Sequence, residues 1–459
     1  MAWGSLPPRG STGSRHLRML AMLVGLLVLL PASRVAGLAG TESVVTAELG
    51  SEEEPDIYED LVVWEDWSRG ETVDIWSFDF STGRYRQISD ARLNEAHPKV
   101  FGDYVVWSAT EIEANGLTPS IAVHNLVSKT TRFARELATP GTWPAGSLHS
   151  GEAAVPPGLY GEVLVWENLN PDGSYDIFYM NLGSGLVVQV TNDQGVQTLP
   201  DVFGNWIVYT AVTDLGGSNE NTDLWVYNVQ TADKVPVAAS LDWDEEQPTI
   251  YGNLLIYADY RDDPDRRVTK FEVTDDANLY AVELSPILNG TLLGAPYPLL
   301  LRRGHQEEPH LSSNGNRLVW RDFDVNATQA DIWTMDLRTG DPELLVQGPA
   351  DEWEIEIWGD RVVWSDFRAD HNEADDVDNW DIYAFCIGTD VCVVVAEDFP
   401  VLVLLVGGLM ALVVAAAAVT VIQGRRAAQP PPEEETRPRK PPKGKGPRPS
   451  PRRPEGEQD

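Results

Sequence analysis

Histidine and carboxylate residues recur just ahead of short apolar segments, a placement from which acid–base chemistry or metal binding could be built. His97, His305 and His310 lie near the starts of such segments, and Glu308 stands close to two of them. A histidine beside a carboxylate can act as a general acid or base. However, single histidines in loops are usually solvated, and the short motifs of serine hydrolases, zinc proteases and sialidases are absent from the sequence. An enzyme is therefore the weaker interpretation.

Acidic residues form a larger set at the same positions. We expect them to surround the mouth of a central opening, where a ring of carboxylates would attract Ca²⁺ or a basic ligand. The alternative is that they are solvated loop charges of a chain whose net charge is −37. The candidate binding residues are Glu95, His97, Glu245, Glu246, Glu308, His310, Asp351 and Glu352.

The densest run of oxygen-bearing side chains lies between residues 366 and 379. Alternating side-chain oxygens suit a hard cation, so a Ca²⁺ site is expected in this run. The run lacks the spacing of an EF-hand loop, with its glycine at the sharp turn, and no cofactor is therefore certain. The candidate metal ligands are Asp370, Asp375, Asp376 and Asp378.

The elements that must position these residues belong to a repeat. Each copy has a proline, a short β-type run, Gly-Asp or Gly-Asn, a second run ending in Trp or Tyr, a variable loop, Asp-Ile-aromatic, Thr-Gly and a fourth run. Clear copies begin at Pro98 and Pro200, and starts fall near residues 55, 98, 156, 200, 248, 309 and 355. Such repetition of short runs and tight turns indicates propeller blades. The predicted fold is all-β, a seven-bladed β-propeller of four-stranded antiparallel blades, with six to eight blades as the range.

Two sets of repeated residues have a structural explanation. An Asp that opens the third strand of a blade usually bonds backbone N–H groups of its own turn, so these residues are not expected to be ligands. The Trp or Tyr that ends the second strand is expected to pack between blades. The aspartates are Asp74, Asp176, Asp223, Asp331 and Asp381, and the aromatic residues are Trp64, Trp107, Trp166, Tyr209, Tyr257, Trp320 and Trp364.

The combination of Pro-x-β-Gly-Asp/Asn, Val-Val-Trp, Asp-Ile-Tyr/Trp and Thr-Gly resembles the repeats of TolB-like propellers, which are related to WD40-like blades, over residues 54 to 396. The usual Ser-Pro-Asp-Gly turn is replaced by aromatic-Gly-Asp/Asn, as in surface-anchored prokaryotic members. The resemblance implies a propeller with a protein-interaction or scaffold role, and much less often an enzyme. It carries over no ligand-binding residue.

Apolar segments flank the repeats. Residues 1–38 read as a signal peptide, because arginines precede an apolar stretch that ends in small residues, with an uncleaved anchor as the alternative. Residues 39–53 form an N-terminal segment, and residues 54–397 the propeller. Residues 399–422 are apolar and uncharged, which predicts a transmembrane helix. The basic, Pro-rich residues 423–459 are expected to be disordered and cytoplasmic, which places the propeller outside the cell on a single-pass membrane protein.

Outside the cell, Cys386 and Cys392 are expected to form a disulfide in the last blade, with a buried thiol pair as the alternative. Asn289 and Asn326 begin glycosylation sequons. We expect residues 391–396 to be the last strand of the ring. No strand from the N-terminus would then be needed, and Val44 to Leu49 would only cover an edge or stay mobile.

Length variation falls in the loops between second and third strands and between blades, which emerge on one face of a propeller and usually carry the binding function. The sequence thus predicts a membrane-anchored extracellular propeller that binds a protein, glycan or cation through this loop-rich acidic face. An unknown protein or glycan of the cell envelope is the expected partner, and the negative charge excludes nucleic acid. The alternatives are a polysaccharide-active lyase or hydrolase, and a structural component of a surface layer.

Overall fold

The computed structural model shows a chain of two compact units, residues 1–396 and 397–459, and every described residue belongs to the first. The described residues are 38–46, 50–68, 72–89, 95–113, 116–146, 148, 156–193, 195–214, 220–238, 243–262, 277–284, 294–324, 329–348, 351–368, 379–389 and 392. Among them, no helix is long and apolar enough to cross a membrane. The predicted transmembrane segment 399–422, the tail 423–459 and the sequons at Asn289 and Asn326 lie outside the described residues, as does the predicted signal peptide apart from its last residue.

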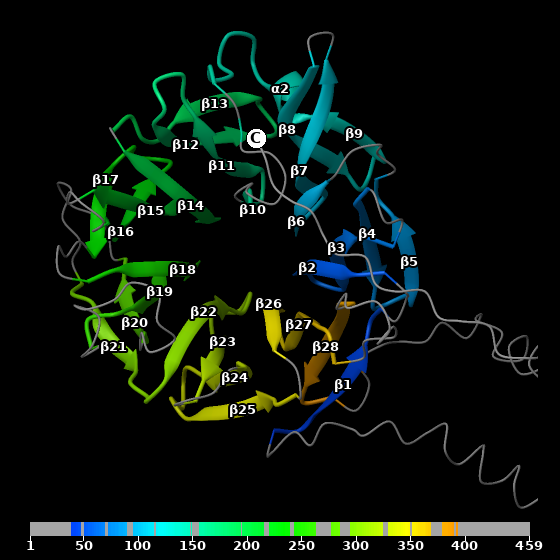
Figure 1. The fold of residues 1–459 in the computed structure, drawn as a ribbon, viewed down its shortest axis with the longest axis vertical. Helices are drawn as coiled ribbons and strands as arrows, with labels where there is room; N and C mark the ends of the chain where they lie inside the picture. The colour runs from blue at the N-terminus through cyan, green and yellow to red at the C-terminus, as the bar shows by residue number, and fades with distance from the viewer. Residues whose placement is uncertain are drawn as a thin grey trace, which may run out of the picture. The chain divides into compact units, whose positions relative to one another are not determined.

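The described residues form antiparallel four-stranded units, which we call blades, arranged around a central axis (Figure 1). The first blade contains β2 (Glu52–Tyr58), β3 (Leu61–Asp66), β4 (Asp74–Asp79) and β5 (Arg84–Gln87). The next contains β6 (Ala96–Phe101), β7 (Tyr104–Glu113), β8 (Gly116–Asn125) and β9 (Thr130–Phe133), and the short helix α2 (Ala134–Leu137) follows it.

The following eight strands form one sheet, which is two blades joined through a single parallel pair between Tyr175 and Val196. These strands are β10 (Gly158–Tyr160), β11 (Val163–Leu169), β12 (Tyr175–Asn181), β13 (Leu186–Gln189), β14 (Val196–Phe203), β15 (Trp206–Asp214), β16 (Glu220–Asn228) and β17 (Lys234–Ala238).

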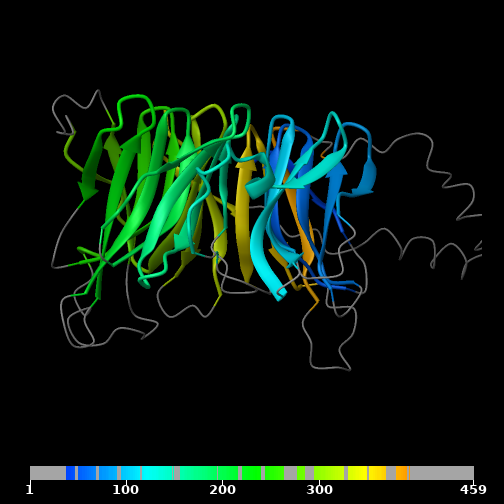
Figure 2. The same cartoon turned by 90° about the horizontal axis from the view of Figure 1, so that it is seen from above.

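Two further blades complete the series before the closing one. They contain β18 (Glu245–Tyr251), β19 (Leu254–Asp259), β20 (Asn278–Glu283) and β21 (Tyr297–Leu300), and then β22 (His305–Leu311), β23 (Arg317–Phe323), β24 (Asp331–Asp336) and β25 (Pro342–Val346). The first strand of a blade contacts the first strand of the next, as β2 does with both β6 and β26 (Glu352–Trp358). These first strands therefore surround the central channel, and the blades stand side by side when the ring is seen edge-on (Figure 2).

The core lies between adjacent blades. Trp107 of β7 is fully buried against Val63 of β3 and Ile75 of β4, which belong to the preceding blade. Tyr257 of β19 likewise packs on Val208 and Val226 of the blade before it. Burying such a side chain contributes about 2 kcal/mol or more, so each blade stabilises its neighbour. The predicted packing role of the aromatic residues that end the second strands is confirmed.

The last blade is closed by the N-terminal end of the propeller. Its strands are β26, β27 (Arg361–Asp366) and β28 (Asp381–Ile387), and β1 (Gly40–Val44) pairs antiparallel with β28 from Gly40 opposite Ile387 to Val44 opposite Tyr383. The prediction that no N-terminal strand is needed is therefore wrong, and the propeller begins at β1 rather than at residue 54.

The reason lies in the turn after β28. Gly388, with φ of 74°, donates its N–H to Ala39 O at 2.6 Å, and Cys392 is bonded back to Cys386. The edge of β28 therefore remains free to pair with β1. This pairing covers a strand edge that would otherwise be exposed. The predicted disulfide is confirmed, whereas the strand predicted in residues 391–396 lies outside the described residues except for Cys392.

Candidate functional site

A bulge interrupts the first strand of most blades at its middle. The residue at the bulge has a positive φ although it is not glycine, and proline follows it in every case but one. This conformation costs about 1 to 3 kcal/mol, and a bulge changes the direction of the side chains around it. The bulge residues are Glu54, His97, Leu199, Gln247, Glu308 and Glu354, with φ between 46° and 56°.

Hydrogen bonds between blades hold several of these bulges. The backbone N–H of Glu54 donates to Glu354 Oε2 of the preceding blade at 2.6 Å. The N–H of Glu308 donates to Gln247 Oε1 at 2.9 Å in the same way, and that of His97 donates to Glu65 Oε1 at 2.6 Å. Each such hydrogen bond contributes about 0.5 to 1.5 kcal/mol, which offsets part of the strain. The bulges thus bring polar side chains of neighbouring blades together at the channel.

Two residues beyond the bulge, charged side chains from different blades meet across the channel. Lys99 Nζ of β6 lies 2.5 Å from Glu356 Oε1 of β26, although the whole blade of β2 stands between those strands. His310 Nδ1 of β22 lies 3.1 Å from Glu356 Oε2, and Asp56 Oδ1 lies 3.7 Å from Lys99 Nζ. We call Lys99, Glu356 and His310 the channel triad.

The triad fixes the charge of its members. Burial opposes ionisation of Glu356, but Lys99 and His310 outweigh it and lower the pKa of this carboxyl to about 2. Burial opposes the charged forms of Lys99 and His310 as well, yet Glu356 raises the pKa of both. Lys99 is therefore held as a cation, and the protonated form of His310 is favoured. Burial raises the pKa of Asp56 to about 6, although Lys99 opposes this shift.

Nearer the loop-rich face lies a group of carboxyls that we call the carboxyl cluster: Glu54, Glu65 and Glu354. Burial, and then the charge of Glu65, raises the pKa of Glu54 to about 7. Burial raises the pKa of Glu65 to about 8, with Glu354 adding to the shift. Burial and then Glu54 raise the pKa of Glu354 well above its usual range. Near neutral pH the cluster therefore retains protons that exposed carboxylates would have released.

His97 lies beside this cluster. Its Nε2 is 3.8 Å from Glu54 Oε1, and its Nδ1 is buried with no hydrogen-bond partner among the described residues. Burial, and then the charge of Lys99, lowers the pKa of His97 to about 4, so the ring is neutral at pH 7. His97 and His310 therefore both lie at the channel, as the sequence predicted.

Arg321 organises a second group at this end of the channel. Its fully buried guanidinium lies 2.8 Å from Glu307 Oε1, 3.2 Å from Glu308 Oε1 and 3.2 Å from Asp351 Oδ1, and it stacks on the ring of Trp353 at 3.8 Å. The predicted binding residues Glu308 and Asp351 are thus ion-paired within the protein. His305, whose Nε2 lies 3.0 Å from Glu307 Oε2, belongs to the same network and not to the triad.

The other predicted acids do not form an open ring. Glu95, Glu245 and Glu352 are at most 6% exposed. Trp107 Nε1 donates to Glu95 Oε1 at 2.9 Å, and burial raises the pKa of Glu245 and Glu352 to about 9. These three face neighbouring strands, which is why the expected placement at a solvated mouth is wrong for them. Glu246 accepts a hydrogen bond from Thr222 Oγ1 at 3.1 Å.

No group of three or more His, Cys, Asp or Glu side chains is placed to hold a metal ion in the described part of the chain. The predicted ligands Asp370, Asp375, Asp376 and Asp378 lie outside the described residues. Ca²⁺ binding by that loop stays a prediction.

At the opposite end, the last residues of six first strands form an aromatic collar. The members are Tyr58, Phe101, Tyr160, Phe203, Tyr251 and Trp358. Neighbouring rings have centroids 4.3 to 4.6 Å apart, from Trp358 through Tyr58 to Tyr251. Phe101 also meets Trp358 at 5.8 Å across the blade between them, so the collar narrows the channel. The site is therefore charged at one end and apolar at the other.

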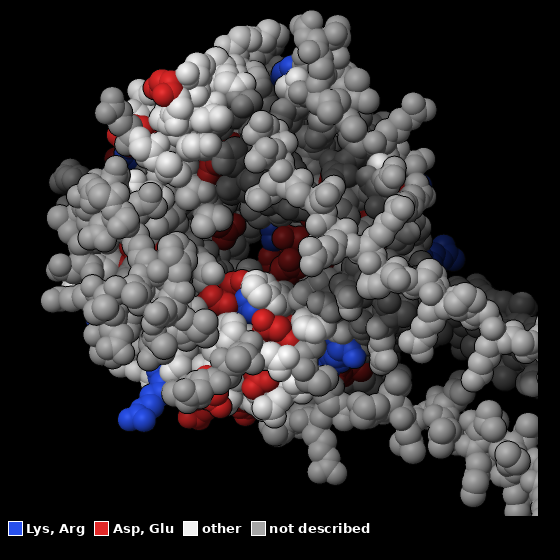
Figure 3. Space-filling view, viewed as in Figure 1, with Lys and Arg blue, Asp and Glu red and all other residues white. Residues whose placement is uncertain are grey.

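Figure 3 shows one face of the molecule, on which acidic and basic side chains gather in the hollow at the centre of the ring. Sequence reasoning found His97, His310 and Glu308, but missed Lys99, Glu356 and Arg321, and missed Glu65 and Glu354 of the carboxyl cluster. Lys99 carried one usable signal, because lysine is very rare in the acidic repeat region. The others look like ordinary strand residues.

No protein-family model and no curated protein matches the sequence. Solved structures do match it. The β-propeller domain of the trilobed protease from Pyrococcus furiosus, described as having an open velcro topology, aligns with a TM-score of 0.53 and 9% identity over 75% of this chain and 99% of that chain. An oligogalacturonate lyase in complex with manganese aligns with a TM-score of 0.50 and 10% identity over 78% of this chain and 96% of that one.

TolB from Acinetobacter baumannii also matches, with a TM-score of 0.34 and 12% identity over 71% of this chain and 61% of that chain. At such low sequence identities the alignments support the fold and no further property. The chain has a β-propeller fold, as the repeats predicted.

Proposed function

We propose that this chain is a seven-bladed binding propeller, which takes a cationic group of its ligand into the acidic end of the channel and performs no chemistry of its own. The observation that carries the proposal is the carboxyl cluster. Glu54, Glu65 and Glu354 are held close together from two adjacent blades, and their pKa values are raised by burial and mutual repulsion.

A cationic group placed among these carboxyls would relieve their repulsion. The described cations nearest to them are already engaged: Lys99 and His310 pair with Glu356, and Arg321 pairs with Glu307, Glu308 and Asp351. An entering amine would displace protons from the cluster and leave carboxylates that it neutralises. His97 beside Glu54 is neutral, and its Nδ1 has no hydrogen-bond partner among the described residues, so it adds a hydrogen-bonding group without adding positive charge.

We propose that the channel catalyses no reaction because of the protonation of the channel triad. A general base must be able to accept a proton near neutral pH. Lys99 is held protonated by Glu356, and the same carboxylate favours the protonated form of His310, which makes both poor acceptors of a proton. His97 is neutral, but its pKa of about 4 makes it a weak base. The carboxyls of Glu54 and Glu65, whose pKa values of about 7 and 8 would suit proton transfer, are assigned here to cation binding.

Calorimetric titration of the full-length chain with spermidine and with trilysine tests the proposal. Binding should be at least about tenfold tighter near pH 8 than near pH 6, since protons compete with the cation, and its heat should depend on the ionisation enthalpy of the buffer. Glu354→Gln should weaken binding about tenfold or more, whereas the exposed Glu343→Gln serves as the matched control. Absence of binding, or equal binding by both variants, contradicts the proposal.

A second candidate is a polysaccharide lyase. The observation in its favour is the pair of basic side chains, Lys99 and His310, deep in the channel, which could neutralise a substrate carboxylate. One structure with the same fold is described as an oligogalacturonate lyase in complex with manganese. Incubation with oligogalacturonate, with and without Mn²⁺, and detection of unsaturated products separates the candidates. Product formation that is lost in His310→Ala would replace the binding proposal.

We also propose that residues 399–422 anchor the propeller outside the cell, with residues 423–459 inside. An epitope tag placed after Asp459 should resist protease added to intact cells, while the propeller remains accessible to antibody. The reverse pattern, or release of the chain into the medium, would contradict this location.

A further inference from the structure

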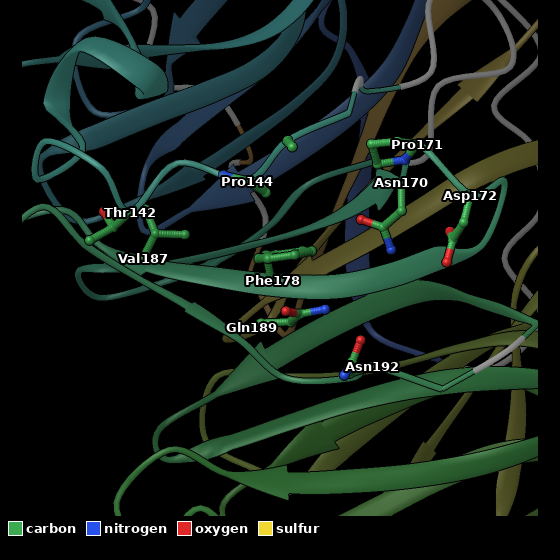
Figure 4. A pocket seen from close by; sticks show the side chains of 10 residues that line it. Thr142, Pro144, Asn170, Pro171, Asp172, Phe178, Val187, Gln189 and Asn192 are labelled. Atoms are coloured by element: carbon green, nitrogen blue, oxygen red, sulfur yellow. The ribbon is translucent and has the colours of Figure 1, made fainter.

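We infer that the loop-rich face carries a second binding site, for an uncharged saccharide, in a cavity beside β12 and β13. The cavity has a volume of about 600 Å³, within the range of small-molecule sites. Thr142 and Pro144 lie on one side of it, Asn170 on another, and Phe178, Gln189 and Asn192 along the strands below (Figure 4).

The chemistry of the lining is neutral and mixed. Amide groups, which offer both donors and acceptors, come from Asn170, Gln189 and Asn192, while Phe178 and Pro144 offer apolar surface. Sugar hydroxyls likewise donate and accept, and pyranose rings have apolar faces. The lining has no lysine, arginine or histidine for an anion, which is a reason to exclude acidic sugars and phosphates.

The single carboxylate in the lining is directed to its own turn. Asp172 Oδ1 accepts hydrogen bonds from Ser174 Oγ at 2.7 Å and from Ser174 N at 3.1 Å. In a chain of net charge −37, a cavity with only one acid, already engaged, is unusual and does not favour a cation. A neutral ligand fits this lining best.

The buried carboxylate of Asp176 orients the amide groups of Asn170 and Gln189 before a ligand binds. Asp176, 1% exposed, accepts hydrogen bonds at Oδ2 from Asn170 Nδ2 at 2.5 Å and from Gln189 Nε2 at 3.1 Å. Asn168 Nδ2 donates to Asn170 Oδ1 at 3.2 Å. With its Nε2 bonded to Asp176, Gln189 has its carbonyl oxygen available to a ligand. Groups oriented before binding lose less entropy when the ligand arrives.

The wall formed by residues 142–145 is also held in place without a ligand. Trp143 stacks on Trp166 with centroids 5.3 Å apart, and Asn168 Nδ2 donates to Ala145 O at 3.1 Å. Next to it, Gly146 has φ of 114° and passes so near Leu169 that an added Cβ would lie 2.1 Å from its carbonyl oxygen. Only glycine permits this close approach, so the local sequence supports a preformed wall.

The test is titration of the full-length chain with neutral trisaccharides: maltotriose, cellotriose, mannotriose and N-acetylchitotriose. At least one should bind, and the double variant Gln189→Ala/Asn192→Ala should weaken it about tenfold or more, because two hydrogen bonds are lost. Both side chains are exposed, so folding should be unaffected, which circular dichroism checks. Asn192→Trp, which fills the cavity, should abolish binding.

Gln230→Ala is the matched control, since Gln230 is an exposed amide on the turn between β16 and β17, and it should bind as the parent does. Glu354→Gln should also bind normally, because the site is separate from the carboxyl cluster. The inference is overturned if no neutral trisaccharide binds, or if binding survives Asn192→Trp. It is also overturned if trigalacturonate or an uncharged tetrapeptide binds more tightly than every neutral trisaccharide.

Discussion

The two ends of the central channel are built from the same first strands, but one end is lined by ionisable side chains and the other by aromatic rings. Along β2 the bulge residue is Glu54, the next inward residue is Asp56 and the last is Tyr58, and along β6 the series is His97, Lys99 and Phe101. Depth in the channel thus sets the chemistry, with ionisable groups toward the loop-rich face and rings toward the hairpin turns.

The difference separates two ways of stabilising the centre of a propeller. Aromatic rings gain from burial under all conditions, whereas buried charges stabilise only while their partners and protons are in place. The collar should therefore act as a constant support. The charged end should respond to pH and to ligands, which is the property that a binding site needs.

Removing Lys99 should give the largest effect. Lys99→Met leaves Asp56 without its cation and Glu356 with His310 alone, and we expect a loss of about 3 to 5 kcal/mol in the free energy of unfolding, measured by urea denaturation. The matched control is Lys234→Met, whose partner Asp193 is 61% exposed, and it should lose about 1 kcal/mol or less. Lys99→Met/Glu356→Gln should recover part of the loss, and strict additivity would argue against the triad.

Opening the collar should have the next largest effect. Phe101→Ala removes a ring that contacts Tyr58, Tyr160 and Trp358, and about 2 to 3 kcal/mol of stability should be lost. Spermidine binding should stay within about twofold of the parent, since the cluster is untouched. Val127→Ala, at a position 72% exposed, should change stability very little. A large loss of binding in Phe101→Ala would mean that the two ends are coupled.

Of the two ends of the channel, only the charged end should make stability depend on pH. The pKa values of Glu54 and Glu65 rise on folding to about 7 and about 8, so the folded chain binds more protons than the unfolded chain above their ordinary range. Stability should therefore fall as pH rises toward about 8, by roughly 1 to 3 kcal/mol. Melting curves at several pH values measure this. Glu65→Gln should flatten the dependence and Phe101→Ala should not, and an unchanged slope in Glu65→Gln contradicts the assignment.

The smallest effect concerns the bulge itself. Leu199 has φ of 49° and is 44% exposed, so Leu199→Gly relieves backbone strain and loses little burial. A gain of about 0.5 to 1 kcal/mol in unfolding free energy is expected. Leu186→Gly, at an exposed strand position with ordinary backbone, should instead lose about that amount. If both variants lose stability equally, the bulges are not strained.

The repeat was predictable because its residues act locally. Gly102 and Asp103 form a tight turn, and the β-branched and aromatic run from Val105 to Trp107 follows it, so strands and blades follow from short-range rules. Ring closure was not predictable from the sequence, because Gly40 to Val44 carry no repeat signature and their partners lie at the far end of the propeller. The site was predicted in part. His97 and His310 precede or follow prolines that mark strand starts, whereas the pairing of Lys99 with Glu356 depends on ring geometry.

Ring closure also has a consequence for the order of folding. β1 is synthesised first, and its partner β28 almost last, so residues such as Val44 and Tyr383 must wait for nearly the whole propeller before they pair. Contacts between such distant segments form slowly. Closure is therefore expected as a late kinetic step. Until then the two ends are open strand edges, and Glu42, which later pairs with Arg368 at 2.7 Å, gives the waiting edge a charge that discourages association with other chains.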